Sequence, residues 1–173
     1  AYHEGGHALV SSVLEFADPV HKVSIVSRGR AGGYTLHIPL DDRKLQTRAE
    51  FLDDIAVSLG GYAAEQMIFG DVTTGPSNDL QVATGLARAM VTRWGMNSEI
   101  GPVALESNGG RTMFGGSSAT GEMSEATHAQ VNAQVKLIME TGLKRAEDVL
   151  TKHRVILDAI AEKLIESETL EQA

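Results

Sequence analysis

Apolar residues recur every three to four positions in the first sixteen residues of the chain. Leu9, Val13 and Leu14 follow this spacing and lie on the same helical face as two histidines. The pattern stops before Pro19, a residue that does not continue a helix. We therefore expect a helix over residues 1–16, with its apolar face buried.

The next apolar residues are largely β-branched. Residues 20–27 and 34–39 predict two strands, and the glycine-rich segment 28–33 between them predicts a turn. We expect the two strands to pair as a hairpin. Pro39 lacks a backbone N–H, so it favours a sheet edge or the end of its strand.

Helical spacing returns after residue 46. Thr47 and Glu50 form a capping-box pattern at the start of one continuous helix, which Gly70 ends. A second helix is predicted from Ser77 or Asn78, as its N-cap, to about residue 94. The residues of this helix expected to face the core are Val82, Leu86, Ala89, Met90 and Val91.

The rest of the chain divides into a loop and a long helical region. Residues 105–123 hold several glycines and serines, which predicts a surface loop or a short hairpin. Apolar residues keep a helical period from residue 124 onward, with a break near Gly142 or His153. The whole pattern predicts a mostly α, α+β fold: one domain over residues 1–173 with a small sheet and a helical C-terminal bundle.

The composition restricts the chemistry of any site. The net charge is −8 and Lys and Arg form no cluster, so nucleic acid is not an expected partner. The chain has no cysteine, so a metal would be held by imidazole and carboxylate groups alone. No apolar run is long enough to cross a bilayer. We expect a soluble fragment of a longer protein, because the chain opens directly on its most reactive segment.

That segment, His3-Glu4-Gly5-Gly6-His7, is an HExxH motif. Histidines four positions apart lie on one side of a helix, so both imidazoles can reach one zinc ion. Glu4 lies beside the metal rather than pointing at it. Its carboxylate can therefore take a proton from a water that zinc has made acidic. The motif predicts a zinc-dependent peptidase with Glu4 as the catalytic base.

A catalytic zinc needs a third protein ligand, for which the residues offer two good candidates. Glu65 lies in a stretch of small residues that would let another helix approach closely, as in gluzincins. Asp79 lies in the first turn of the following helix, where its purely structural interpretation is a charge that stabilises the helix dipole. The weaker candidates are His21 and His37 on strands and His128 and His153 on the late helix.

The order of short motifs resembles the peptidase domain of the FtsH family, which comprises membrane-anchored, ATP-dependent AAA+ zinc proteases. The resemblance covers almost the whole chain. Beyond residues 1–8 it rests on segments 18–23, 28–29, 60–61, 63–65, 69–70, 74–75, 78–80, 90–91, 94–96 and 168–170. The chain departs from the family pattern at Gly5, at Gly142 and in the loop 105–123, and none of these is a candidate ligand.

The resemblance implies roles for particular residues. It points to Asp79 as the third ligand beside His3 and His7, with one Zn²⁺ per chain. Glu65 then becomes a residue that hydrogen-bonds a zinc-bound imidazole. The resemblance also implies an edge strand on which an unfolded polypeptide is laid. This strand comprises Gly33, Tyr34, Thr35 and Leu36.

The resemblance further implies a larger assembly. Family members are hexamers that degrade unfolded or membrane proteins, and their ATP is used by an AAA+ domain whose P-loop does not occur in this sequence. Only upstream segments would reach the membrane. The peptidase domain would lie in the bacterial cytoplasm, or in a mitochondrion or chloroplast.

Two other functions are compatible with the residues. One is a non-catalytic assembly domain with a degenerate metal site, whose helices only form a hexameric ring, although an intact Glu4 argues against it. The other is a gluzincin-like peptidase that uses Glu65 as the third ligand, with Asp79 merely capping a helix.

Overall fold

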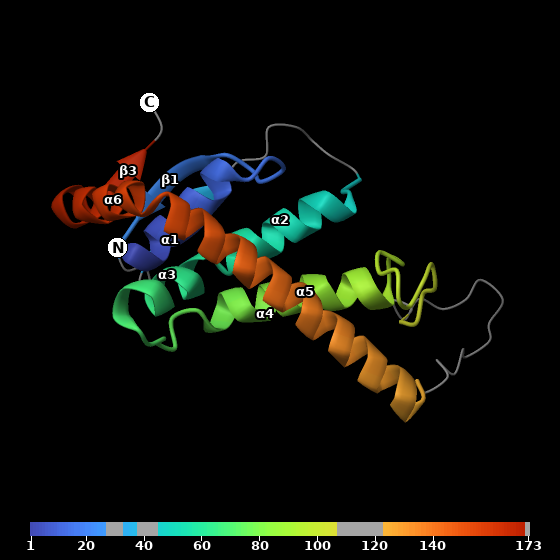
Figure 1. Cartoon of the computed structure of the whole chain (residues 1–173). Coiled ribbons are helices and arrows are strands. Elements are labelled where there is room, and N and C mark those ends of the chain that lie inside the picture. Colours follow the sequence, from blue (N-terminus) through green and yellow to red (C-terminus); the bar gives the residue numbers. More distant parts are fainter. Residues whose placement is uncertain (27–32, 38–44, 107–122, 172–173) are drawn as a thin grey trace.

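The computed structural model describes residues 1–26, 33–37, 45–106 and 123–171, which form a set of helices with a small sheet at one side (Figure 1). The helices are α1 (Tyr2–Val13), α2 (Arg48–Ser58), α3 (Gly60–Phe69), α4 (Ser77–Thr92), α5 (Glu125–Lys152) and α6 (Arg154–Ser167). The strands are β1 (Val20–Ser24), β2 (Tyr34–His37) and β3 (Thr169–Glu171). The mostly helical α+β class is confirmed.

Helix α1 lies at the centre of the fold. Residues 4–11 are all buried, because α1 contacts α2, α3, α5, α6 and the sheet. Val10, for example, packs in one cluster with Leu150 of α5 and Leu157 of α6. Burial of side chains of this size contributes roughly 1.5–3 kcal/mol each. The helix that carries the HExxH motif is therefore firmly held.

The close approach of α1 to α3 depends on two glycines. A Cβ on Gly6 would lie 2.4 Å from the carbonyl oxygen of Gly60, and a Cβ on Gly60 would lie 2.9 Å from the carbonyl oxygen of Gly6. Both distances are shorter than van der Waals contact, so a side chain at either position would force the helices apart. The small residues of α3 do let another helix approach closely, as predicted.

The strands form one antiparallel sheet in the order β2-β1-β3. The predicted pairing of the first two strands is confirmed, although most of the turn 28–33, Pro39 and the predicted loop from 107 to 122 lie outside the described residues. Strand β3 was not predicted, because three residues are too few to show an alternating pattern. Glu168, in the left-handed conformation with φ of 59°, turns the chain from α6 back along β1.

Two predicted helices have the wrong extent. The first ends at Val13 rather than residue 16, because Leu14 is extended and the N–H of Phe16 donates to Asp53. The predicted continuous helix from residue 47 to 70 is two helices that meet at Leu59, beyond which α3 packs against α1. The outer ends of that pair are as predicted: a capping box at Thr47 and Glu50, and a left-handed Gly70.

Helix α4 begins one residue earlier than predicted. Its N-cap is Pro76, not Ser77 or Asn78, because the N–H of Leu80 donates to the carbonyl oxygen of Pro76. Val82 was expected to face the core but is 49% exposed. The buried residues include Ala83, Ala87, Met90 and Val91, which keep a spacing of three to four and leave Val82 outside their stripe.

The long C-terminal helical region breaks at His153 and not at Gly142. Gly142 instead packs against α2, where a Cβ would lie 2.7 Å from Cγ2 of Ile55. Helix α5 begins after Ser124, whose side chain accepts a hydrogen bond from the N–H of Thr127. Among the described helices, none combines the length and the hydropathy needed to cross a membrane.

Candidate metal centre

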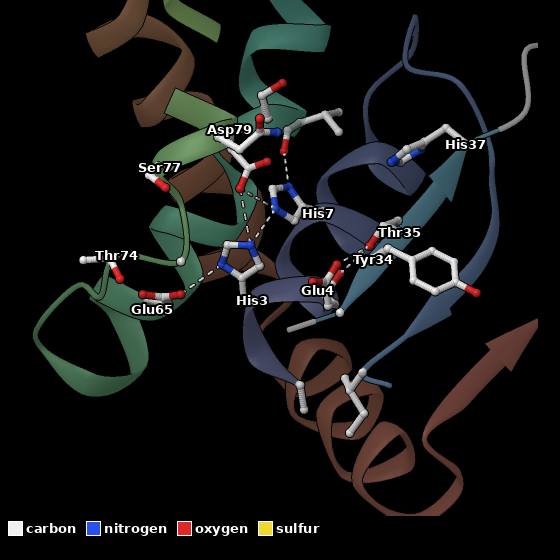
Figure 2. A pocket seen from close by; sticks show the side chains of 17 residues that line it. His3, Glu4, His7, Tyr34, Thr35, His37, Glu65, Thr74, Ser77 and Asp79 are labelled. Atoms are coloured by element: carbon white, nitrogen blue, oxygen red, sulfur yellow. Dashed lines mark hydrogen bonds and ion pairs between the residues drawn. The ribbon is translucent and has the colours of Figure 1, made fainter. Parts of the chain in front are cut away.

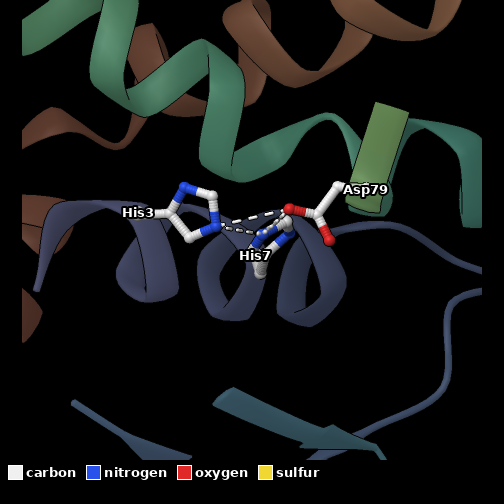
Figure 3. Close-up of side chains that lie close together, drawn as sticks. All are labelled: His3, His7 and Asp79. Atoms are coloured by element: carbon white, nitrogen blue, oxygen red, sulfur yellow. Dashed lines mark hydrogen bonds and ion pairs between the residues drawn. The ribbon is translucent and has the colours of Figure 1, made fainter. Parts of the chain in front are cut away.

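The two histidines of α1 and Asp79 of α4 converge on one point (Figure 3). His3 Nε2 lies 3.1 Å from His7 Nε2, and Asp79 Oδ2 lies 3.4 Å from the first nitrogen and 3.5 Å from the second. Ligand atoms about 2.0–2.2 Å from a tetrahedral zinc ion are themselves about 3.3–3.6 Å apart. The three side chains thus have nearly the spacing of ligands around one ion.

The hydrogen bonds of the two imidazoles fix which nitrogen is free. His7 Nδ1 lies 2.7 Å from the carbonyl oxygen of Val57, which can only accept, so Nδ1 carries the proton. His3 Nδ1 lies 2.9 Å from Glu65 Oε1, a carboxylate that likewise accepts. In both neutral imidazoles the lone pair is therefore on Nε2. Two lone pairs and a carboxylate that face one another repel unless a positive charge lies between them, which a metal ion would supply.

The electrostatics of the cluster also favour a cation. Burial lowers the pKa of the His3 imidazole, but hydrogen bonds to Asp79 and Glu65 and the negative charges of Glu4 and Asp79 outweigh burial and raise that pKa. Burial raises the pKa of the Asp79 carboxyl, but the adjacent imidazoles of His3 and His7 hold it well below its usual range. The negative field that retains a proton here would equally stabilise a divalent metal ion.

Glu65 contacts the side of His3 that faces away from Asp79 (Figure 2). Its other oxygen, Oε2, accepts hydrogen bonds from the N–H of Thr73 at 2.9 Å and from the Thr73 hydroxyl at 3.0 Å. Burial raises the pKa of Glu65, and these bonds together with the one to His3 more than offset it, so the pKa is lowered. Both oxygens of Glu65 are thus committed to donors away from the Nε2 atoms.

Gly61 was not singled out from the sequence as a residue of the site. A Cβ at this position would lie 2.5 Å from His3 Cε1 and 2.5 Å from His7 Nε2. Both imidazoles therefore lie directly against the backbone of α3. The adjacent pair Gly60-Gly61 is the only sequence signal of this contact, and it does not reveal which imidazoles pack there.

Replacing Gly61 by Ala is expected to weaken zinc binding by about 10–100-fold, because the new methyl group must displace one or both imidazoles. Gly85 on α4 provides the matched control, since a Cβ there would meet nothing within 4 Å. Gly85→Ala should keep zinc and gain up to about 1 kcal/mol of helix stability. Competition with a chromophoric chelator measures the zinc affinity of both variants. Wild-type affinity in Gly61→Ala would refute this role.

The three side chains line a cleft of about 910 Å³ between α1, β2, α3 and the N-terminus of α4. Glu4 also lines the cleft and accepts a hydrogen bond from Thr35 on β2 (Figure 2). Of the predicted edge strand, Gly33, Tyr34 and Thr35 line the same cleft, whereas Leu36 does not and is 42% exposed. Within the described residues, β2 is at one edge of the sheet.

The remaining histidines do not join the cluster. Among the described residues, the group that could hold a metal is His3, His7 and Asp79. His37 lines the cleft, but its Nδ1 lies 3.3 Å from the carbonyl oxygen of Asp18, and burial lowers the pKa of this imidazole. The sequence could not show the positions of Val57 and Thr73, because their contacts with the site arise only from folding.

Comparison with known proteins gives one consistent match. The family model described as Peptidase family M41 matches residues 1–173. The ATP-dependent zinc metalloprotease FtsH of Bacillus subtilis is 43% identical over 173 residues, FtsH 1 of Conexibacter woesei 45% over 173, and FtsH 3 of Synechocystis 46% over 177. Each match covers 99% of this chain but only 26% to 29% of the relative. The chain thus spans about a quarter of the length of these curated relatives.

Proposed function

This chain belongs to peptidase family M41, and we propose that it is the zinc-dependent endopeptidase domain of an FtsH-type protease that cleaves unfolded or membrane-derived polypeptides. The observation that carries the proposal is the convergence of His3, His7 and Asp79 beside Glu4 in one cleft. The HExxH motif supplies His3, Glu4 and His7, and α4 supplies Asp79.

In this proposal His3, His7 and Asp79 hold one zinc ion per chain. Zinc lowers the pKa of water to about 7 and polarises a peptide carbonyl. The Glu4 carboxylate accepts a proton from the attacking water and passes it to the leaving amine. Glu65 holds His3 in the tautomer that leaves Nε2 free, and the Val57 carbonyl does the same for His7.

Strand β2 is the proposed binding surface for the substrate. It lines the cleft next to Glu4 and lies at one edge of the sheet within the described residues, where an extended polypeptide could bind alongside it as a further strand. Such pairing uses backbone N–H and C=O groups, which every polypeptide offers. Binding through residues 33–36 would therefore select extended chains and impose little sequence preference.

The gluzincin-like alternative is less compatible with the site. Glu65 would have to give up its hydrogen bonds to His3 and Thr73 before an oxygen could reach the metal. A domain that only forms a ring does not require both imidazoles and Glu4 to face one cleft, so the assembly-domain alternative does not explain their orientation. Hexameric assembly, membrane anchoring and ATP-driven delivery belong to the same proposal for the longer protein, in which ATP acts outside this domain.

Metal removal tests the proposal. Purified full-length protein should hold about one zinc per chain, and 1,10-phenanthroline should abolish casein hydrolysis, which added Zn²⁺ restores. ATP hydrolysis by the same sample is the control, because it should continue without zinc. The proposal is wrong if a sample never exposed to chelator contains no zinc and takes none up.

A further inference from the structure

Strand β2 turns alternate residues toward α1, as the two-residue period of a strand requires. The hydroxyl of Thr35 donates a hydrogen bond to Glu4 Oε2 at 3.0 Å and lies 3.3 Å from the Glu4 carbonyl oxygen. Two residues later, His37 Nδ1 lies 3.3 Å from the hydroxyl oxygen of Ser11. Two residues earlier, Gly33 lies against the Glu4 side chain.

Gly33 leaves the space that the Glu4 side chain occupies. A Cβ at position 33 would lie 2.8 Å from Glu4 Oε1 and 2.9 Å from Glu4 Cγ. It would also lie 2.7 Å from the carbonyl oxygen of Ser24 on β1, so the strand could not retreat to make room. The Glu4 carboxylate is therefore in direct contact with β2.

Thr35 can fix the carboxylate because Thr35 is itself fixed. It pairs with Val23 of β1, which is 5% exposed and packs in the core. The hydroxyl thus has a stable position from which to hold Oε2, and a glutamate side chain without this bond has several rotamers. The hydrogen bond from Thr35 is made to Oε2, so it does not occupy Oε1, the oxygen that would accept the proton.

We propose that Thr35 is a positioning residue for peptide hydrolysis, whose hydroxyl holds Glu4 in the orientation that accepts the proton. The inference rests on the proposed function, in which β2 also carries the substrate. One strand then sets the position of both the peptide and the base. A misplacement of about 1 Å in such a group can cost on the order of 100-fold in rate.

Thr35→Val and Thr35→Ser in the full-length protein test this inference. Valine keeps the shape and β-propensity of threonine but has no hydroxyl, so kcat for a fluorogenic peptide should fall about 10–100-fold with KM changed less than about threefold. Serine keeps the hydroxyl and should retain kcat within about threefold. Thr35→Ala removes the same hydroxyl and replaces the valine variant if that variant does not fold. Thr141→Val, which loses a hydroxyl bonded to the Leu137 carbonyl on α5, is the control.

Two readouts are independent of turnover. Zinc should remain at about one per chain in every variant, and crystal structures should show the Glu4 carboxylate displaced in Thr35→Val but not in Thr35→Ser. Wild-type kcat in Thr35→Val, equal losses in both variants, an unmoved Glu4 or loss of zinc would each overturn the inference. Glu4→Gln distinguishes failure of the proposed function from failure of the Thr35 inference. If Glu4→Gln cleaves peptide normally, the proposed function itself is wrong. If Glu4→Gln is inactive and Thr35→Val is normal, only the positioning role of Thr35 is wrong.

Discussion

Glu4→Gln is expected to lower proteolysis by the full-length protein by at least roughly 100-fold while zinc stays bound. Glutamine has nearly the shape of glutamate, and its amide oxygen can still accept the hydrogen bond from Thr35. The amide accepts no proton from water near neutral pH, so the proposed base is lost while the three proposed zinc ligands are untouched. Casein hydrolysis and elemental analysis on the same preparation measure the two expectations.

Glu15→Gln is the matched control for this experiment. Glu15 is exposed and follows α1, so the same change of charge is made outside the cleft. Its proteolysis and zinc content should equal those of the wild type. Near-normal hydrolysis in Glu4→Gln would mean that another group accepts the proton from water.

The second large effect is expected at Asp79. Asp79→Asn removes a charged oxygen that faces both Nε2 atoms, so we expect zinc affinity to fall by more than about 100-fold. Glu65→Gln removes only a group that orients His3, and such a loss typically costs about 10–100-fold in metal affinity or activity. Competition with a chromophoric chelator ranks the two variants under identical conditions.

Asp71→Asn is the control for charge, because Asp71 is exposed in the loop that precedes α4 and should not affect zinc. If Asp79 were only a helix-dipole residue, its replacement would cost about 0.3–1 kcal/mol of stability and leave zinc binding unchanged. Full zinc retention in Asp79→Asn together with loss in Glu65→Gln would favour the gluzincin-like arrangement.

The part of the site that is local in sequence was predictable from spacing. His3 and His7 share one helix, so a period of 3.6 residues places their imidazoles together without knowledge of the fold. Asp79 is different, because it reaches them only when α4 packs against α2 and α5 in the folded chain. Spacing alone left both Glu65 and Asp79 open, with a helix-dipole role the better interpretation of Asp79, and only the resemblance to a known family favoured Asp79 as the ligand.

The fold shows the same division. The capping box at Thr47 and the left-handed Gly70 are set by neighbouring residues and were predicted. The break at Leu59 was not, because the apolar pattern continues through it and the change of direction serves the contact of Gly60 with α1. Strand β3 likewise forms only because it pairs with β1, and the three residues of β3 give no sign of that pairing.

A crystal structure of the protein, with anomalous data collected at the zinc absorption edge, tests the central claim most directly. The account predicts one strong anomalous peak per chain, about 2.0–2.2 Å from His3 Nε2, His7 Nε2 and an oxygen of Asp79. Glu65 should remain on Nδ1 of His3, and Glu4 should lie near the metal without binding it. A peak bound by Glu65 instead of Asp79, or no zinc at the two histidines, would contradict the account.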